Sequence, residues 1–367
     1  MGFLKKINPG ILFLGLNGFL ATFAFSFVPI FLVGKGFSFS QIIFLYAIYT
    51  GLSSLLLLFI PRFHVKKSIF FGIFAYSLMA FVFVYYTTAS YLLYALFSAL
   101  SIIFFWIPLN YFIFKEGKGN SNASDSSFYV VLPGVISIII PPISSLVITN
   151  FGYQALFLIT AMIYLLAMLI FWNLVREEVI DVKTSESIRS FKGFKSISLI
   201  EGSLHFFVGT IIPVYSLMFF KTARSFSYFL SYLGLIAFII ALFIAKRSDK
   251  TRRRKRYLYI LLAAMAASIF LLPFAKTSFA WIITIIPLTL FYTVSYPIRL
   301  AILLDKKKPD LGFWKAREIF LNFGRLITLS ISALLFYYQM FWAVLLMYGI
   351  LLIPYIFLVE YKLKHVR

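Results

Sequence analysis

The sequence predicts an all-α membrane protein with twelve transmembrane helices arranged as two six-helix pseudo-repeats. The first observation is composition: the 367-residue chain is 62% hydrophobic and only 13% charged, with a mean hydropathy of +0.96. Soluble domains carry about 25% charged residues, so a water-soluble enzyme is excluded. The second observation is that the apolar residues form runs of roughly 20 residues, the length that crosses the hydrocarbon core as a helix.

Polar or charged breaks separate twelve such runs along the chain. Backbone groups in lipid must be hydrogen-bonded within their own segment, so each run is expected to be a helix. The expected spans are 11–33, 38–60, 68–86, 91–114, 128–149, 153–175, 197–220, 226–245, 257–275, 279–304, 319–338 and 341–359.

The positive charges predict the orientation of these spans. Lys and Arg number 34 against 12 Asp and Glu, a net charge of +22, and 28 of the 34 cations fall on one side of the predicted bundle. Loops rich in Lys and Arg stay in the cytoplasm. Both termini are therefore expected to be cytoplasmic, in a multi-pass protein of the cell membrane. The charge describes topology, and we expect no nucleic-acid partner.

The first six predicted helices resemble the last six. Asn17-Gly18 in the first helix corresponds to Glu201-Gly202 in the seventh, and each pair is followed after ten residues by a proline. Pro108-Leu109-Asn110 in the fourth helix corresponds to Pro297-Ile298-Arg299 in the tenth. These matches predict a parallel duplication. The expected units are a six-helix bundle at 1–175, a polar cytoplasmic linker at 176–196 and a second bundle at 197–367.

This repeat and two loops resemble the major facilitator superfamily. The stretch from Ser248 to Arg254, which contains Asp249, is similar to the Asp-Arg/Lys-x-Gly-Arg-Arg signature of that family, although Arg252 stands where glycine is usual. Asn150 to Phe157 resembles the link between helices 5 and 6. In the first-half loop, Arg62 occupies the position of the signature aspartate. The resemblance implies a monomeric transporter whose central cavity is lined by helices 1, 4, 7 and 10.

Few polar side chains fall inside the predicted spans, and they are the candidate functional residues. An ionised group there costs about 2.5–3.5 kcal/mol. Glu201 and His205 share one face of the seventh helix, and Glu318, Asn322 and Arg325 share one face of the eleventh. The candidate substrate or coupling residues are Asn17, Asn110, Glu201, His205, Tyr296, Arg299, Asn322 and Arg325, and the candidate ion-pair or gate residues are Glu318 and Asp249.

Each candidate also has a purely structural interpretation. Glu201 and Glu318 fit the first turn of a helix, where a carboxylate complements the macrodipole. Arg299 fits a side chain that reaches the headgroups, and His205 fits a hydrogen bond between packed helices. Arg325 fits a clasp with Glu318. The functional interpretation instead places Glu201 near Arg299, in a polar ring within the cavity, in at least one state.

The leading functional hypothesis is a secondary active transporter that works by alternating access, with proton coupling through Glu201 or His205 left open. The two intramembrane arginines, Arg299 and Arg325, favour an anionic or zwitterionic solute. Alternatives are a lipid flippase or scramblase on the same fold and a membrane-embedded transferase, which would need carboxylates at a membrane face. The chain has no cysteine and no nucleotide-binding motif, so we expect no catalytic residue, cofactor or metal.

Overall fold

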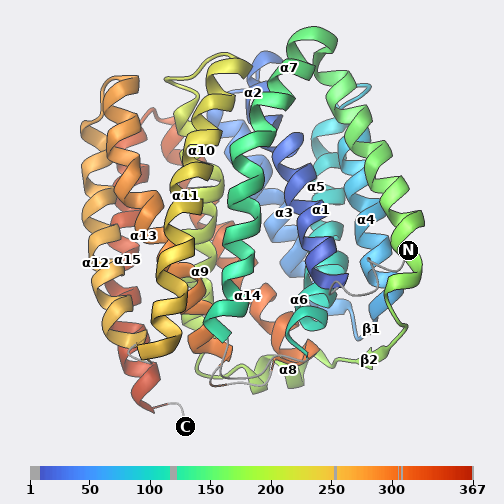
Figure 1. The fold of residues 1–367 in the computed structure, drawn as a ribbon, viewed down its shortest axis with the longest axis vertical. Coiled ribbons are helices and arrows are strands. Elements are labelled where there is room, and N and C mark those ends of the chain that lie inside the picture. Colours follow the sequence, from blue (N-terminus) through green and yellow to red (C-terminus); the bar gives the residue numbers. More distant parts are fainter. Residues whose placement is uncertain (1–8, 116–121, 252–253, 305, 307–308, 366–367) are drawn as a thin grey trace.

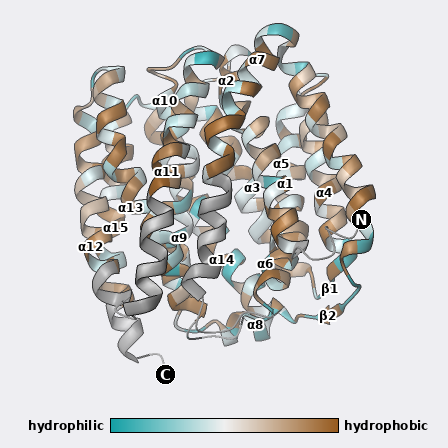
Figure 2. Cartoon of the chain, viewed as in Figure 1, coloured by the Kyte–Doolittle hydropathy of each residue, from teal (hydrophilic) through white to brown (hydrophobic). Residues whose placement is uncertain are grey.

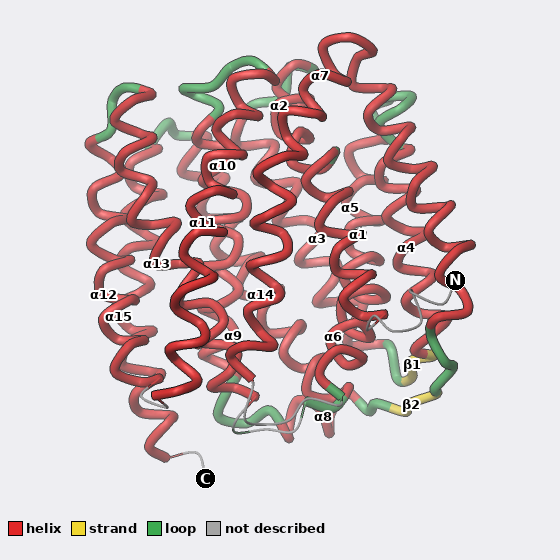
Figure 3. The backbone as a smooth tube through the Cα atoms, viewed as in Figure 1, coloured by secondary structure: helices red, strands yellow, loops and turns green. Residues whose placement is uncertain are grey.

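In the computed structural model the chain forms a bundle of helices that run between two ends, where most of the loops lie (Figure 1 and Figure 3). The structure describes residues 9–115, 122–251, 254–304, 306 and 309–365. We call residues 9–175 the N-terminal part and residues 195–365 the C-terminal part. In Figure 1 the blue-to-green N-terminal part lies mainly on the right, and yellow and orange helices of the C-terminal part lie on the left.

The N-terminal part consists of helices broken by short 3₁₀ and π segments. Its elements are α1 (Pro9–Phe23), η2 (Phe25–Phe27), α2 (Val28–Gly34), α3 (Phe39–Phe59), β1 (Arg62–His64), α4 (Val65–Phe81), α5 (Ser90–Ser101), η3 (Ile102–Trp106), α6 (Ile107–Phe114), α7 (Asn122–Phe171) and η4 (Trp172–Leu174).

The linker and the C-terminal part follow. The linker holds β2 (Val179–Asp181) and α8 (Thr184–Ser190). The C-terminal part contains α9 (Lys195–Phe206), η5 (Phe207–Ile211), α10 (Ile212–Ser216), α11 (Ala223–Thr251), α12 (Arg254–Leu271), η6 (Leu272–Phe274), α13 (Ser278–Leu304), α14 (Leu311–Tyr337) and α15 (Phe341–His365).

The helical fold predicted from the sequence is confirmed. Apolar residues cover much of the bundle, and hydrophilic residues gather near β2 and α8 (Figure 2). Within the described residues, eight segments are long and apolar enough to span a membrane, and two apolar helices are shorter, Ala223–Ile239 and Leu258–Phe274. The count of twelve spans in two repeats stays a prediction. The eight longer segments are Gly10–Gly34, Phe39–Phe59, Ser90–Phe114, Gly134–Leu174, Lys195–Ser216, Ser278–Leu304, Leu311–Tyr337 and Phe341–Val359.

The break expected between the fifth and sixth spans lies inside α7. Gly152 has φ 81° and ψ 171° there, a backbone conformation that glycine adopts readily because it has no Cβ. The chain reverses direction at this point, at the top of the bundle in Figure 1. The sequence placed the break correctly, at residues 150–152.

The linker is attached to the N-terminal part at one end of the bundle, which we call the linker end. Strands β1 and β2 pair antiparallel, with Arg62 opposite Asp181 and in ion-pair contact with it. Lys115 Nζ donates to Glu178 Oε2 over 2.7 Å, and this hydrogen bond holds the pKa of the Glu178 carboxyl below its usual range. Glu178 is therefore ionised at neutral pH, and the bond fastens the linker to the end of α6.

The start of the eleventh predicted span is wrong by eight residues. We expected 319–338, but α14 begins at Leu311, because Asp310 caps it: its side chain accepts a hydrogen bond from the Phe313 amide at 2.7 Å. Lys315 and Arg317 consequently lie within the helix, and both are buried. The span predicted at 319–338 leaves both residues in the preceding loop instead.

Helices α9 and α14 pack backbone to backbone at two glycines. A Cβ added to Gly202 would lie 2.1 Å from the Leu321 carbonyl oxygen, and one added to Gly324 would lie 1.9 Å from the Leu199 carbonyl oxygen. Small residues allow membrane helices to approach this closely. The contact brings the polar faces of α9 and α14 together. The N- and C-terminal parts meet mainly where α7 packs on α11 and where α3 packs on α14.

Candidate functional site

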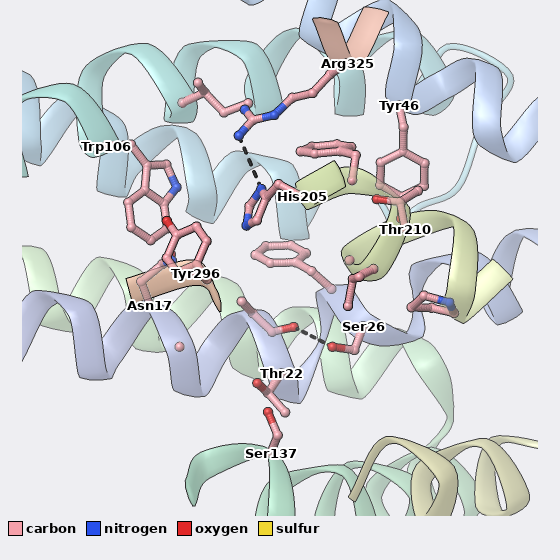
Figure 4. A pocket seen from close by; sticks show the side chains of 18 of the residues that line it. Asn17, Thr22, Ser26, Tyr46, Trp106, Ser137, His205, Thr210, Tyr296 and Arg325 are labelled. Atoms are coloured by element: carbon pink, nitrogen blue, oxygen red, sulfur yellow. Dashed lines mark hydrogen bonds between the residues drawn. The ribbon is translucent and has the colours of Figure 1, made fainter. Parts of the chain in front are cut away.

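A cavity of about 660 Å³ lies between the N- and C-terminal parts. Side chains from both parts line it, including Asn17 and Trp106 of the N-terminal part and His205, Tyr296 and Arg325 of the C-terminal part (Figure 4). Cavities that hold small ligands measure about 300–1,000 Å³. The volume therefore suits a small organic molecule.

Contacts between the two parts lie at both ends of this cavity. At the linker end, Ser54 Oγ of α3 donates to the Ile319 carbonyl of α14 over 2.9 Å, and the ring centroids of Phe114 and Trp314 are 5.3 Å apart. At the opposite end, Ser40 Oγ donates to the Ala333 carbonyl over 2.7 Å. The same pair of helices, α3 and α14, thus touches at both ends of the cavity.

An ion-pair cluster forms the α9–α14 side of the cavity. Arg317 Nη2 lies 3.3 Å from Glu201 Oε2, and Arg317 Nη1 lies 3.8 Å from Glu318 Oε1. The side chain of Glu201 is only 1% exposed and that of Arg317 only 5%. Buried charges of this kind are stable only when they are paired. Arg317 supplies the charge that permits Glu201 to lie inside the bundle.

Arg325 extends the cluster into the cavity. Its Nη1 donates to Asn322 Oδ1 over 2.7 Å and lies 3.6 Å from Glu318 Oε2. Its Nη2 lies 3.3 Å from His205 Nδ1, the contact drawn in Figure 4. The clasp between Arg325 and Glu318, one of the two interpretations drawn from the sequence, is therefore present in the structure. Asn322 is buried but is not on the cavity wall.

Arg299 lies beside the cavity wall and not on it. Its guanidinium carbon is 5.3 Å from the ring centroid of Tyr292 and 5.7 Å from that of Tyr296, and both tyrosines line the cavity. The sequence places Glu201 near Arg299 in at least one state; in this structure the cation at ion-pair distance from Glu201 is Arg317. The early start of α14 supplies this buried cation, which the span predicted at 319–338 leaves in the preceding loop.

The side formed by the N-terminal part is uncharged. Asn17 and Asn110 both line it, and Tyr164 Oη donates to Asn17 Oδ1 over 3.1 Å. Trp106 Nε1 donates to Tyr76 Oη over 2.8 Å. The structure thus brings seven of the ten candidate residues to the cavity wall. They are Asn17, Asn110, Glu201, His205, Tyr296, Glu318 and Arg325.

Lys315 is a second buried cation of α14 that lies before the span predicted at 319–338. Its Nζ donates to the Ile60 carbonyl over 2.5 Å, to the Val182 carbonyl over 3.0 Å and to Thr184 Oγ1 over 2.6 Å. Ile60 is the C-cap of α3, so its carbonyl lies at the negative end of the helix dipole. These three bonds, which we call the Lys315 clamp, join α14 to α3 and to the linker.

The remaining candidate, Asp249, has a side chain outside the described part of the structure. The described residues contain no group of three or more His, Asp or Glu side chains that could hold a metal ion.

The sequence matches the model of one known protein family over about half of its length. The family model of the Major Facilitator Superfamily matches residues 123–312, which is 190 of the 367 residues. This chain belongs to the major facilitator superfamily. The family that the sequence resembles is thereby confirmed. As a major facilitator it is a multi-pass membrane transporter of a small molecule and not an enzyme.

The fold of this major facilitator is similar to that of a solved relative. The crystal structure of the human organic anion transporter MFSD10 (TETRAN) superposes with a TM-score of 0.73, covering 97% of this chain and 99% of that chain. The two sequences are 10% identical, so the likeness concerns the fold alone. A search of curated proteins found no match.

Proposed function

We propose that this major facilitator is a secondary active transporter that moves a small anionic or zwitterionic solute by alternating access. The observation that carries the proposal is the cavity of about 660 Å³ between the N- and C-terminal parts, lined by both. A site at such an interface opens to either side when one part rocks against the other. MFSD10, which shares the fold, is an organic anion transporter.

The proposal includes a topology. Residues 1–175 and 197–367 form two bundles of six spans each, joined by the linker at 176–196, in a monomer with cytoplasmic termini in the cell membrane. The distribution of Lys and Arg supports this orientation, because it makes the linker end the cytoplasmic end. The Lys315 clamp then holds the cytoplasmic end closed.

Proton coupling is assigned to Glu201. In its ionised form the carboxylate pairs with Arg317 over 3.3 Å. A proton taken up by Glu201 would remove this attraction and leave Arg317 able to turn towards Glu318 or an incoming anion. Uptake of the proton and rearrangement of the cluster are thereby linked, because both change the same ion pair.

Transport is tested with purified protein in liposomes, using as solute the compound that raises its melting temperature most in a screen of metabolites. We expect saturable uptake that exchanges with unlabelled solute inside. A fluorescent lipid is followed in parallel. If the lipid moves and no solute is taken up, the transport proposal is wrong and the scramblase alternative is supported. If neither the lipid nor the solute moves, both hypotheses are contradicted.

The coupling is tested with Glu201→Gln in the same liposomes. Wild-type uptake is expected to rise at least tenfold when a proton gradient is applied, and the variant is expected to lose this response while it retains exchange. Glu186→Gln serves as the matched control, because Glu186 is exposed in α8 and pairs only with Lys183 in the described structure. An unchanged response in Glu201→Gln would remove Glu201 from the coupling role.

A further inference from the structure

The cavity wall is divided into an ionisable side and an uncharged side. The C-terminal part contributes every ionisable Glu, His and Arg side chain that the described residues place on the wall: Glu201, His205, Arg317, Glu318 and Arg325. The N-terminal part contributes amides, hydroxyls and aromatic rings, among them Asn17, Tyr46, Tyr49, Trp106 and Asn110. Among the described residues, a solute that fills the cavity therefore meets charged groups of the C-terminal part only, and aromatic rings of both parts.

Arg325 is the arginine on the wall that is least compensated by carboxylate. Its guanidinium bonds are to neutral or ring groups, Asn322 at 2.7 Å and His205 at 3.3 Å. Glu318 lies at 3.6 Å and is also 3.8 Å from Arg317. The Nε of Arg325 has no hydrogen-bond partner among the described residues, and Arg325 is only 6% exposed. A buried donor without a partner is costly, so an anion that accepts from Arg325 would be stabilised.

Aromatic rings lead away from Arg325 into the uncharged side. The ring of Phe206 lies 4.6 Å from the Arg325 guanidinium carbon. The ring centroids of Phe206 and Tyr49 are 6.0 Å apart, and those of Tyr49 and Tyr46 are 5.5 Å apart. Both pairs are in edge-to-face geometry. Figure 4 places Arg325 and Tyr46 in the same region of the cavity. Edge-to-face contacts of this kind favour a further aromatic ring over an aliphatic one of equal size.

The hydroxyls of Tyr46 and Tyr49 are available to such a ring. In the part of the chain that the structure describes, no hydrogen bond of either hydroxyl is present, whereas Tyr76 and Tyr164 use theirs within the protein. A polar substituent on a bound ring would find these hydroxyls as partners. The uncharged side therefore recognises a ring by its faces and edges and tolerates substituents.

We propose that the solute is a small organic anion with an aromatic ring, whose anionic group binds Arg325 and whose ring contacts Phe206, Tyr49 and Tyr46. This inference rests on the proposed transport function and names its substrate class. It assigns Arg325 to the charge of the solute and the three rings to its aromatic body. A cavity of about 660 Å³ accommodates one or two fused rings with substituents.

The test uses four probes on the purified full chain, with the melting temperature and a dissociation constant as readouts. They are 2-naphthoate, its saturated analogue decahydronaphthalene-2-carboxylate, its uncharged analogue 2-naphthalenemethanol, and glucuronate as an anion on a hydroxylated ring. We expect 2-naphthoate to bind at least tenfold more tightly than each of the other three. Equal binding of the saturated analogue, tighter binding of glucuronate, or no binding of 2-naphthoate would overturn the proposal.

Variants separate the roles of the charge and the rings. Arg325→Gln is expected to weaken 2-naphthoate at least tenfold, and Phe206→Leu is expected to weaken 2-naphthoate about tenfold while binding of the saturated analogue changes less than threefold. Phe206→Leu provides the test if Arg325→Gln does not fold. Lys276→Gln, at an exposed position, is the matched control. Unchanged 2-naphthoate binding in Arg325→Gln or Phe206→Leu would overturn the assignment.

Failure of this inference and failure of the proposed function are distinguishable. If 2-naphthoate binds as expected but liposomes accumulate no solute, the binding site stands and transport fails. If liposomes accumulate a solute that is not an aromatic anion, and 2-naphthoate does not compete, transport stands and the substrate class is overturned.

Discussion

Replacing Arg317 with leucine is expected to lower the free energy of unfolding by about 3–5 kcal/mol, the range for removing one partner of a buried ion pair. Glu201 would then be left 1% exposed without the cation that lies 3.3 Å from it. The loss is measured as a fall in melting temperature of the detergent-purified protein. Arg189→Leu is the control, because Arg189 is exposed in α8, and we expect a change below about 0.5 kcal/mol there.

A double variant distinguishes the ion pair from simple packing. Arg317→Met combined with Glu201→Gln removes both charges, and we expect it to recover most of the stability that Arg317→Met loses, because a buried pair replaced by neutral groups of similar size is often tolerated. If the double variant is instead as unstable as the sum of the two single variants, the pair contributes nothing specific and Arg317 acts only by its volume.

Replacing Gly324 with alanine is expected to destabilise the fold by about 3 kcal/mol or more, the upper range for overpacking. The added Cβ would lie 1.9 Å from the Leu199 carbonyl oxygen and 2.7 Å from its carbonyl carbon. Both are backbone atoms, so α9 and α14 must separate. Because Glu201 and His205 of α9 meet Arg317 and Arg325 of α14, this separation should also weaken the ion-pair cluster.

Gly34→Ala is the matched control for the glycine contact. A Cβ at Gly34, in helix α2, meets no heavy atom within 4 Å, so alanine there is expected to be neutral or slightly stabilising. Melting temperature in detergent and the yield of monodisperse protein report both variants. A Gly324→Ala protein as stable as the wild type would show that α9 and α14 are not held in this close contact.

The helical fold was predictable because the apolar runs match the thickness of the hydrocarbon core. A helix satisfies every backbone hydrogen bond within such a run. The reversal at Gly152 was predictable for the same reason, since a polar, glycine-containing break separates two runs. The start of α14 was not predicted, because Lys315 and Arg317 were interpreted as loop charges. Asp310, which follows Pro309, is a favoured N-cap residue and indicates a helix start at this point. That Lys315 and Arg317 are buried in this helix depends on their partners in other elements, which only the tertiary structure reveals.

The candidate site was predictable in its residue types but not in its pairing. Buried polar residues in the predicted spans indicated Glu201, His205 and Arg325, and all three line the cavity. The ion-pair partner of Glu201 depends on the close approach of α9 and α14. Two glycines that are 122 positions apart, Gly202 and Gly324, allow this approach. A single sequence gives no register between such distant helices. The Lys315 clamp was hidden for the same reason, because its three acceptors lie in α3 and the linker.

Alternating access is tested most directly by distances across the two ends of the bundle, measured by pulsed electron spin resonance. The chain has no cysteine, so spin labels attach only where cysteines are introduced. One pair, Lys67→Cys with Lys306→Cys, spans the linker end, and the other, Thr88→Cys with Ser278→Cys, spans the opposite end. Each pair is measured in the wild-type background and with Lys315→Met, which removes the Lys315 clamp.

We expect two populations of spin–spin distances at each end. Conditions that favour the longer distance at the linker end should favour the shorter distance at the opposite end, because one end closes when the other opens. In Lys315→Met the longer linker-end population should increase at least threefold, because the bonds to Ile60, Val182 and Thr184 are lost. A single unchanged distance at both ends, in the wild type and in Lys315→Met alike, would contradict alternating access in this protein.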